Sequence, residues 1–181
     1  MLTTRPGKRD KVGFLNTDLM YDILDQDNLI GNLVYDKKAL RGSLTLGDQT
    51  YTVARTTDQQ EERLYQALIR MMTGGDKPPA NPIALRNAAG ETLALAEHAG
   101  QGFAVSRGGE SFAFRKPSSS SRPFHFYRQG DDQSLGSVGQ EKFFSRTLHM
   151  NLPKEFDPAF QVFLLILLLN LTMERLENSA N

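Results

Sequence analysis

The stretch FQVFLLILLLNLTM, residues 160–173, decides the fold because no side of it would be polar in a helix. Its polar residues up to position 171 are Gln161 and Asn170, which point in different directions at 100° per residue. A helix that is apolar on every side has to be surrounded by other apolar groups. We therefore expect the rest of the chain to enclose this segment.

The expected helix has a clear beginning and end. Asp157 is a good N-cap, and Pro158 suits the first helical position, where its missing N–H costs nothing. We predict a helix over 157–176, in which the part from Pro158 to Leu176 is about 28 Å long at the usual rise per residue. A membrane tail anchor is the alternative interpretation, but a spanning helix needs roughly 20 apolar residues, which favours a buried core helix.

The chain before this helix shows the period of two that is typical of β-strands. Short apolar runs are broken by Gly, Asp, Asn and Pro, as in all-β folds. Glycines at 47, 90 and 108–109 predict three antiparallel hairpins. The expected strands lie near residues 12–15, 20–25, 28–35, 39–46, 49–56, 81–86, 91–97, 102–107, 110–116, 122–129, 134–139 and 142–149.

One segment departs from the strand pattern. Residues 59–72, QQEERLYQALIRMM, place apolar side chains at helical spacing, with acidic residues first and Arg70 last. We predict an inserted amphipathic helix there, followed by a Gly/Pro-rich loop. The length suits one domain covering residues 1–181.

About twelve strands followed by FSRTLHMNLPKEFDPAFQVFLLILLL, residues 144–169, resemble the tubby C-terminal-like superfamily. That superfamily includes tubby domains, phospholipid scramblases and the LURP-one-related proteins. The resemblance implies a mainly β fold in which a closed antiparallel barrel of about 12 strands wraps the hydrophobic C-terminal helix.

Two departures from the superfamily bear on function. The chain lacks cysteine, so the cysteine-rich stretch of the scramblases is absent, and NLPKEFD at 151–157 is not a convincing calcium loop. No Lys/Arg set aligns with the phosphoinositide pocket of tubby domains, so no binding residue is carried over. The chain most resembles the LURP-one-related group and its bacterial relatives.

Composition sets further bounds. Lys plus Arg equals Asp plus Glu at 21 each, which makes nucleic acid an unlikely partner for the surface as a whole. Without cysteine there is no disulfide framework, thiolate metal site or cysteine nucleophile. The basic N-terminus is not followed by an apolar segment of the kind a secretory signal has. We expect a cytoplasmic protein. If it binds lipid, we expect it to lie at the membrane surface as a peripheral protein.

The strongest candidate for binding is a basic stretch between residues 101 and 128. It carries one anion, Glu110, and several aromatic residues, so it could hold an anionic lipid head group or a nucleic-acid phosphate. The competing interpretation is a solvated hairpin with outward charges. The candidate residues are Arg107, Arg115, Lys116, Arg122 and Arg128.

The other polar residues predict structural roles. Asp22, Asp25 and Asp27 do not match a calcium loop and indicate a turn between two strands. The three histidines have no metal-binding spacing, and His125 should face away from its phenylalanine neighbours. Asn170 should bond to a nearby backbone group. No nucleophile motif is present, and we expect no catalytic residue, metal or cofactor.

These observations favour a non-enzymatic binding module for anionic phospholipid head groups or for a protein partner. The alternative is a soluble enzyme or small-molecule binder whose site lies at a barrel end. The first interpretation rests on the fold resemblance and on local charge.

Overall fold

The computed structural model describes most of the chain. Residues outside the description include the predicted strand at 12–15, the predicted helix at 59–72 and Arg122. The description covers residues 1–7, 18–56, 81–118, 121, 123–140 and 147–179, with side chains through residue 174.

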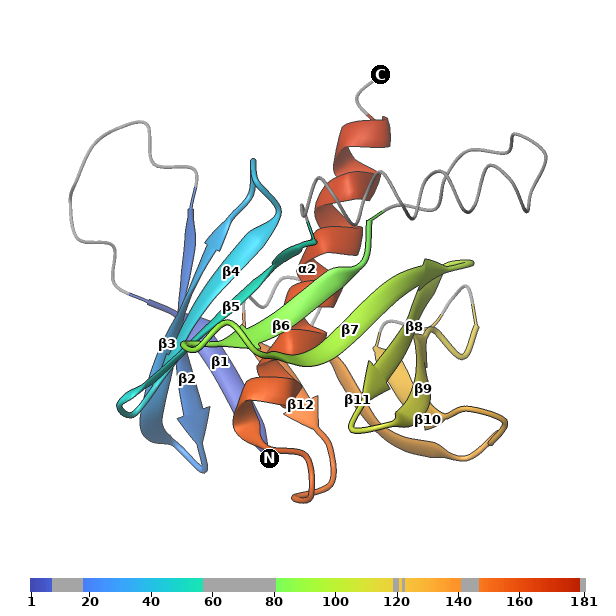
Figure 1. Cartoon of the computed structure of the whole chain (residues 1–181), viewed down its shortest axis with the longest axis horizontal. Helices are drawn as coiled ribbons and strands as arrows, with labels where there is room; N and C mark the ends of the chain where they lie inside the picture. The colour runs from blue at the N-terminus through green and yellow to red at the C-terminus, as the bar shows by residue number, and fades with distance from the viewer. Residues whose placement is uncertain (8–17, 57–80, 119–120, 122, 141–146, 180–181) are drawn as a thin grey trace.

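The described chain forms a closed antiparallel barrel around one helix, as predicted (Figure 1). Consecutive strands are neighbours throughout, and β1 closes the barrel by pairing with both β2 and β12. The strands are β1 (Leu2–Pro6), β2 (Leu19–Asp25), β3 (Asn28–Asp36), β4 (Arg41–Leu46), β5 (Gln49–Arg55), β6 (Ile83–Asn87), β7 (Thr92–Ala99), β8 (Gly102–Arg107), β9 (Glu110–Arg115), β10 (Phe124–Arg128), β11 (Ser134–Gln140) and β12 (Leu148–Asn151).

The closing strand β1 was not among the strands predicted from the sequence. Thr3 lies opposite Leu24 of β2 on one side and His149 of β12 on the other. Leu2 and Thr4 point inward and are buried, and the Thr4 hydroxyl accepts a hydrogen bond from the Leu148 N–H. LTTRP is too short and too polar to show an apolar alternation, so its pairing depends on the two neighbouring strands.

The three hairpins predicted from glycine are confirmed. They join β4 to β5, β6 to β7 and β8 to β9. Gly47, Gly90, Gly108 and Gly109 all have positive φ, which side chains disfavour. These turns set the register in which alternate side chains face the helix.

The central helix α2 spans Pro158–Ser179 and begins as predicted. The Asp157 carboxylate accepts a hydrogen bond from the Phe160 N–H at 2.9 Å, which is N-capping geometry. Every residue from Phe160 to Leu167 is buried, and α2 occupies the middle of the barrel in Figure 1. Among the described residues, no helix has the length and apolarity needed to cross a membrane.

Aromatic rings fill the barrel where α2 begins. Phe156 lies edge-on to Phe112 and Phe126, with ring centroids 5.8 and 5.4 Å away. Phe160 continues the cluster along the helix, 5.4 Å from Phe156. His125 faces away from this core, as predicted, while Phe126 beside it is fully buried.

Contacts between helix and barrel predict a large cost for trimming α2. Ile166 packs so closely on β4 that a Cβ at Gly42 would lie 2.6 Å from its Cδ1. We expect Ile166→Ala to lower the free energy of unfolding by about 2–5 kcal/mol, measured by chemical denaturation. Leu29→Ala is the control, because Leu29 is 62% exposed. Equal costs for the two variants would contradict the packing described here.

Candidate functional site

The antiparallel order collects the strand ends at two ends of the barrel. At one end α2 begins, and Arg107 at the end of β8 reaches Asp157. At the other end α2 leaves, and Arg55 at the end of β5 reaches Glu174 at 2.7 Å. We call these the helix-start end, with the turns at 26–27, 47–48, 108–109 and 129–133, and the helix-exit end, with residues 6–7, 36–41, 100–101 and 115–118.

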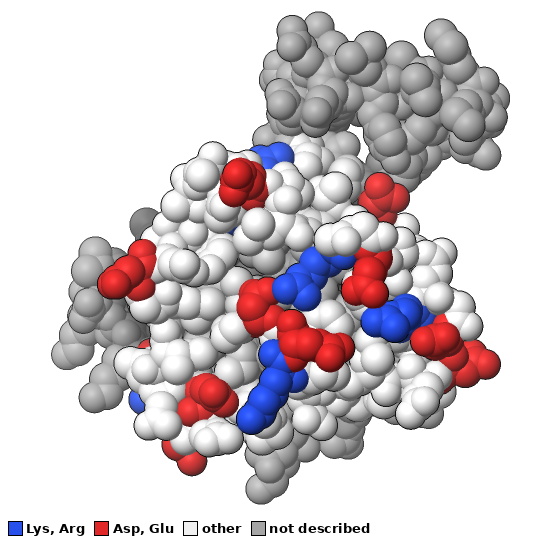
Figure 2. All heavy atoms as spheres, turned by 60° about the horizontal axis from the view of Figure 1, so that its bottom comes forward, with Lys and Arg blue, Asp and Glu red and all other residues white. Residues whose placement is uncertain are grey.

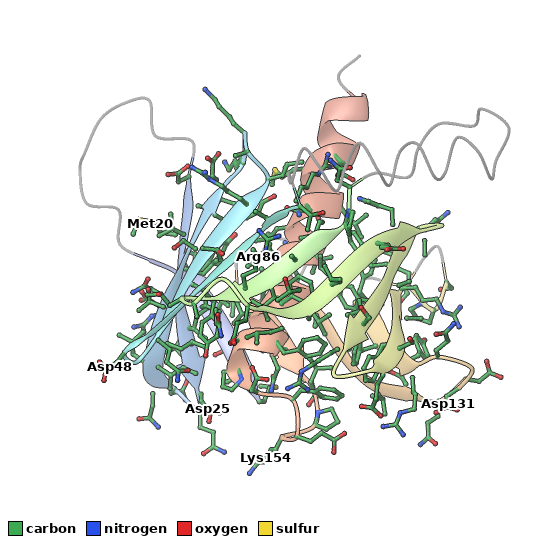
Figure 3. All side chains as sticks on the ribbon, in the orientation of Figure 1. Met20, Asp25, Asp48, Arg86, Asp131 and Lys154 are labelled. Carbon is green, nitrogen blue, oxygen red and sulfur yellow. The ribbon has the colours of Figure 1, made fainter. Side chains whose placement is uncertain are left out.

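The helix-start end is predominantly acidic. Figure 2 shows this end with more acidic than basic side chains, and Figure 3 labels Asp25, Asp48 and Asp131 there beside Lys154. Its basic residues are Arg107, Arg128 and Lys154. Its acidic residues are Asp25, Asp27, Asp48, Glu91, Glu110, Asp131, Asp132, Glu155 and Asp157.

The helix-exit end has the opposite balance. Its cations in the described chain are Lys37, Lys38, Arg41, Arg55, Arg115 and Lys116. Its carboxylates there are Asp18, Asp36, Glu97 and Glu174. In the described part of the chain the two barrel ends thus differ in the sign of their charge, although the whole sequence has no net charge.

Two residues of the predicted basic stretch lie at the acidic end and are already paired. Arg107 contacts Asp157 at 2.5 Å, with its guanidinium 4.8 Å from the centre of the Phe160 ring. Arg128 contacts Glu110 at 3.2 Å. The predicted set is therefore not one patch, because the β8–β9 hairpin sends its turn and its strand ends to opposite ends of the barrel.

Arg115 and Lys116 form the other half of that stretch, at the helix-exit end. The Arg115 guanidinium lies 4.8 Å from the Tyr127 ring centre, and the Lys116 ammonium lies 5.6 Å from that of Phe124. Neither cation has a carboxylate within 4.0 Å in the part of the chain that is described. His125, the register partner of Arg115, adds a polar ring beside them.

Of the three aspartates predicted to form a turn, Asp27 does so, whereas Asp22 and Asp25 are residues of β2 itself. Asp22 pairs with Arg5 at 3.1 Å, and Asp25 lies 3.8 Å from the N-terminal ammonium. Gln26 and Asp27 take positive φ in the turn to β3. Within the described ranges, no group of three or more His, Asp or Glu side chains could hold a metal ion.

Two polar clusters at the helix-exit end were not predicted from the sequence. Glu174 lies between Arg55 and His98, 3.6 Å from the His98 Nε2, and so ties α2 to β5 and β7. Asp36 accepts hydrogen bonds from the N–H groups of Ala39 and Lys38. These hydrogen bonds, with Arg41 nearby, hold the pKa of the Asp36 carboxyl below its usual value of 3.8.

Asn170 does not bond to a nearby backbone group, so that hypothesis was wrong. Its Oδ1 accepts a hydrogen bond from the Tyr35 hydroxyl at 2.6 Å, and both residues are fully buried. The residues are 135 positions apart, which is why no local pattern could indicate the contact. The Asn170 Nδ2 is buried and has no hydrogen-bond partner among the described residues.

The buried Tyr35–Asn170 pair predicts coupled effects on stability. Tyr35→Phe and Asn170→Leu should each cost about 1–3 kcal/mol, because each leaves a buried polar group without this partner. The double variant should cost less than the sum of the two. Chemical denaturation of the four proteins measures the coupling, and strictly additive costs would refute it.

Known proteins give no information about the function of this chain, so the functional argument rests on its fold and its charges. No family model, curated protein or solved structure matches the chain.

Proposed function

We propose that this chain is a non-enzymatic binding module with a tubby-like barrel, which attaches to anionic phospholipid head groups through its helix-exit end. The observation that carries the proposal is the pair Arg115 and Lys116. Both cations lie over aromatic rings at the barrel end and have no carboxylate partner among the described residues.

The architecture favours a site on an end or on the outer wall. The residues from Phe160 to Leu167 are all buried inside the barrel, so the helix takes the space in which many barrels hold a ligand. Strand ends and turns are left as the exposed places where functional groups gather.

The charge difference between the ends supports an orientation at the membrane. Each cation near an anionic surface contributes about 1 kcal/mol, so a few of them give weak, salt-sensitive attachment. The acidic helix-start end would be repelled by the same surface. The module would therefore attach peripherally, with the exit of α2 toward the lipid.

Vesicle co-sedimentation tests this proposal with two matched charge reversals. Lys116→Glu changes the helix-exit end, and Lys154→Glu makes the same change at the helix-start end, where the side chain is exposed. We expect binding to phosphatidylserine or phosphoinositide vesicles at low salt. Lys116→Glu should weaken it by about thirtyfold, since reversal of one charge removes about 2 kcal/mol. Lys154→Glu should leave it unchanged.

Two results would overturn the lipid proposal. One is the absence of wild-type binding to anionic vesicles at low salt, which would favour a protein partner instead. The other is an equal effect of Lys116→Glu and Lys154→Glu, which would mean that the barrel end does not matter. Binding that persists unchanged at high salt would contradict the electrostatic mechanism.

A further inference from the structure

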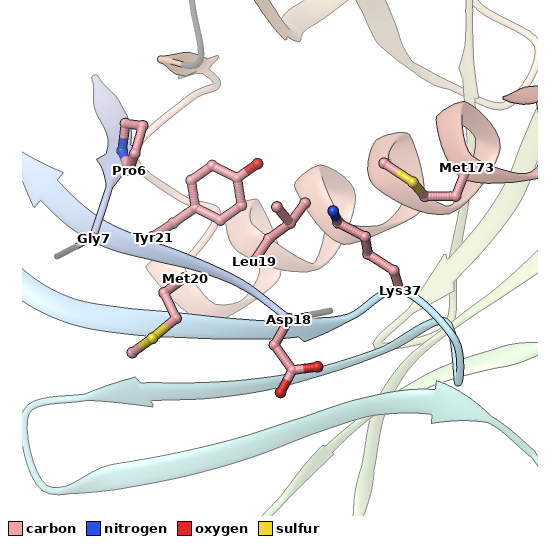
Figure 4. Close-up of a pocket in the computed structure, with 8 residues that line it drawn as sticks. All are labelled: Pro6, Gly7, Asp18, Leu19, Met20, Tyr21, Lys37 and Met173. Atoms are coloured by element: carbon pink, nitrogen blue, oxygen red, sulfur yellow. The ribbon is translucent and has the colours of Figure 1, made fainter. Parts of the chain in front are cut away.

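A pocket of about 460 Å³ opens at the helix-exit end, apart from Arg115 and Lys116 (Figure 4). It lies between the end of β1, the start of β2, the β3–β4 turn and the last turns of α2. Its volume falls within the range of about 300–1,000 Å³ that is common for small-molecule sites. The lining residues are Pro6, Gly7, Asp18, Leu19, Met20, Tyr21, Lys37 and Met173.

The inner wall of the pocket is apolar. Leu19 and Tyr21 are alternate residues of β2 and so share one face of the strand, and Met173 faces them from α2. Figure 4 shows these three side chains turned toward one space, while Asp18 and Met20 lie on the other side of the strand. An apolar wall of this kind suits a short hydrocarbon chain.

Among the described residues that line this space, Lys37 is the cation. Figure 4 shows its ammonium directed toward Tyr21 and Met173. Among the described residues no carboxylate lies within 4.0 Å of it, and neighbouring Asp36 is bound to the Lys38 and Ala39 N–H groups and to Arg41. An ammonium beside apolar side chains with no carboxylate partner favours an anionic group.

A buried donor lies on the core side of the same region. Asn170 is one helical turn before Met173 on the same face of α2. Its partner Tyr35 is the register neighbour of Leu19, which lines the pocket. Within the described chain the Asn170 Nδ2 has no acceptor, so it is a second donor group on this side of the pocket.

We propose that this pocket binds a small anionic amphiphile. Its head, a carboxylate or a phosphate, contacts Lys37, and its short hydrocarbon chain packs against Leu19, Tyr21 and Met173. This site is separate from the vesicle contact at Arg115 and Lys116, so either proposal can fail without the other.

Calorimetric titration of the full protein tests the pocket with four probes that each contain eight carbon atoms. Octanoate and octyl phosphate carry the two anionic heads, octylamine reverses the charge, and octanol has none. Each probe is used below the concentration at which it forms micelles. We expect both anions to bind and octylamine not to bind. Shortening octanoate to hexanoate should weaken binding by about fourfold per methylene removed.

Variants at neighbouring lysines locate the head group. Lys37→Met keeps most of the side-chain length, removes the charge and should weaken octanoate binding at least tenfold. Lys38→Met, at an exposed neighbour, should leave the affinity unchanged. Lys37→Glu should reverse the preference and bind octylamine, a gain that misfolding cannot produce.

Three outcomes would overturn the assignment. They are no binding of either anion to the wild type, equal affinities in Lys37→Met and Lys38→Met, and octylamine binding to the wild type as tightly as octanoate. Retained octanoate binding in Lys116→Glu would support the separation of this pocket from the vesicle contact.

Discussion

The burial of α2 inside the strands is the constraint on which the rest of the structure depends. The residues from Phe160 to Leu167 have no exposed side, so the strands must surround them completely. That requirement gives the short polar strand β1 its importance, because its pairing with β2 and β12 removes the last open edge. It also moves any binding site away from the middle of the barrel.

The antiparallel connections then divide the charged residues between two ends. Since every strand is joined to its neighbour in sequence, alternate turns lie at the same end. Among the residues that the structure describes, the turns at the helix-start end are rich in Asp and Glu, and those at the helix-exit end are rich in Lys and Arg. A neutral chain can therefore present one attractive and one repulsive end to an anionic surface, a property that its net charge conceals.

The fold could be predicted from the sequence because helix caps and turn glycines act over only a few residues. Asp157 and Pro158 marked the start of α2, and the glycines at 47, 90 and 108–109 marked three hairpins. The strand β1 lacked such a signal, since Leu2 is the one large apolar residue in it.

The positions of the candidate site residues could not be predicted, because they depend on contacts between residues that are far apart in the sequence. Arg107 and Arg115 are close in sequence, yet the register of β8 and β9 places them at opposite ends. Asn170 found its partner in Tyr35, far away in the chain. The pocket at Lys37 joins β1, β2, the β3–β4 turn and α2, so it exists only once the barrel has closed.

Native-state hydrogen exchange of the α2 amides tests most directly whether the barrel is built around the helix. If it is, the amides between residues 160 and 171 exchange only when the whole domain unfolds. Their exchange free energy then equals the free energy of unfolding from denaturant titration, and matches that of the slowest strand amides. Exchange of these amides through a smaller opening, while the strands stay protected, would show that the barrel stands without its helix and would contradict the account.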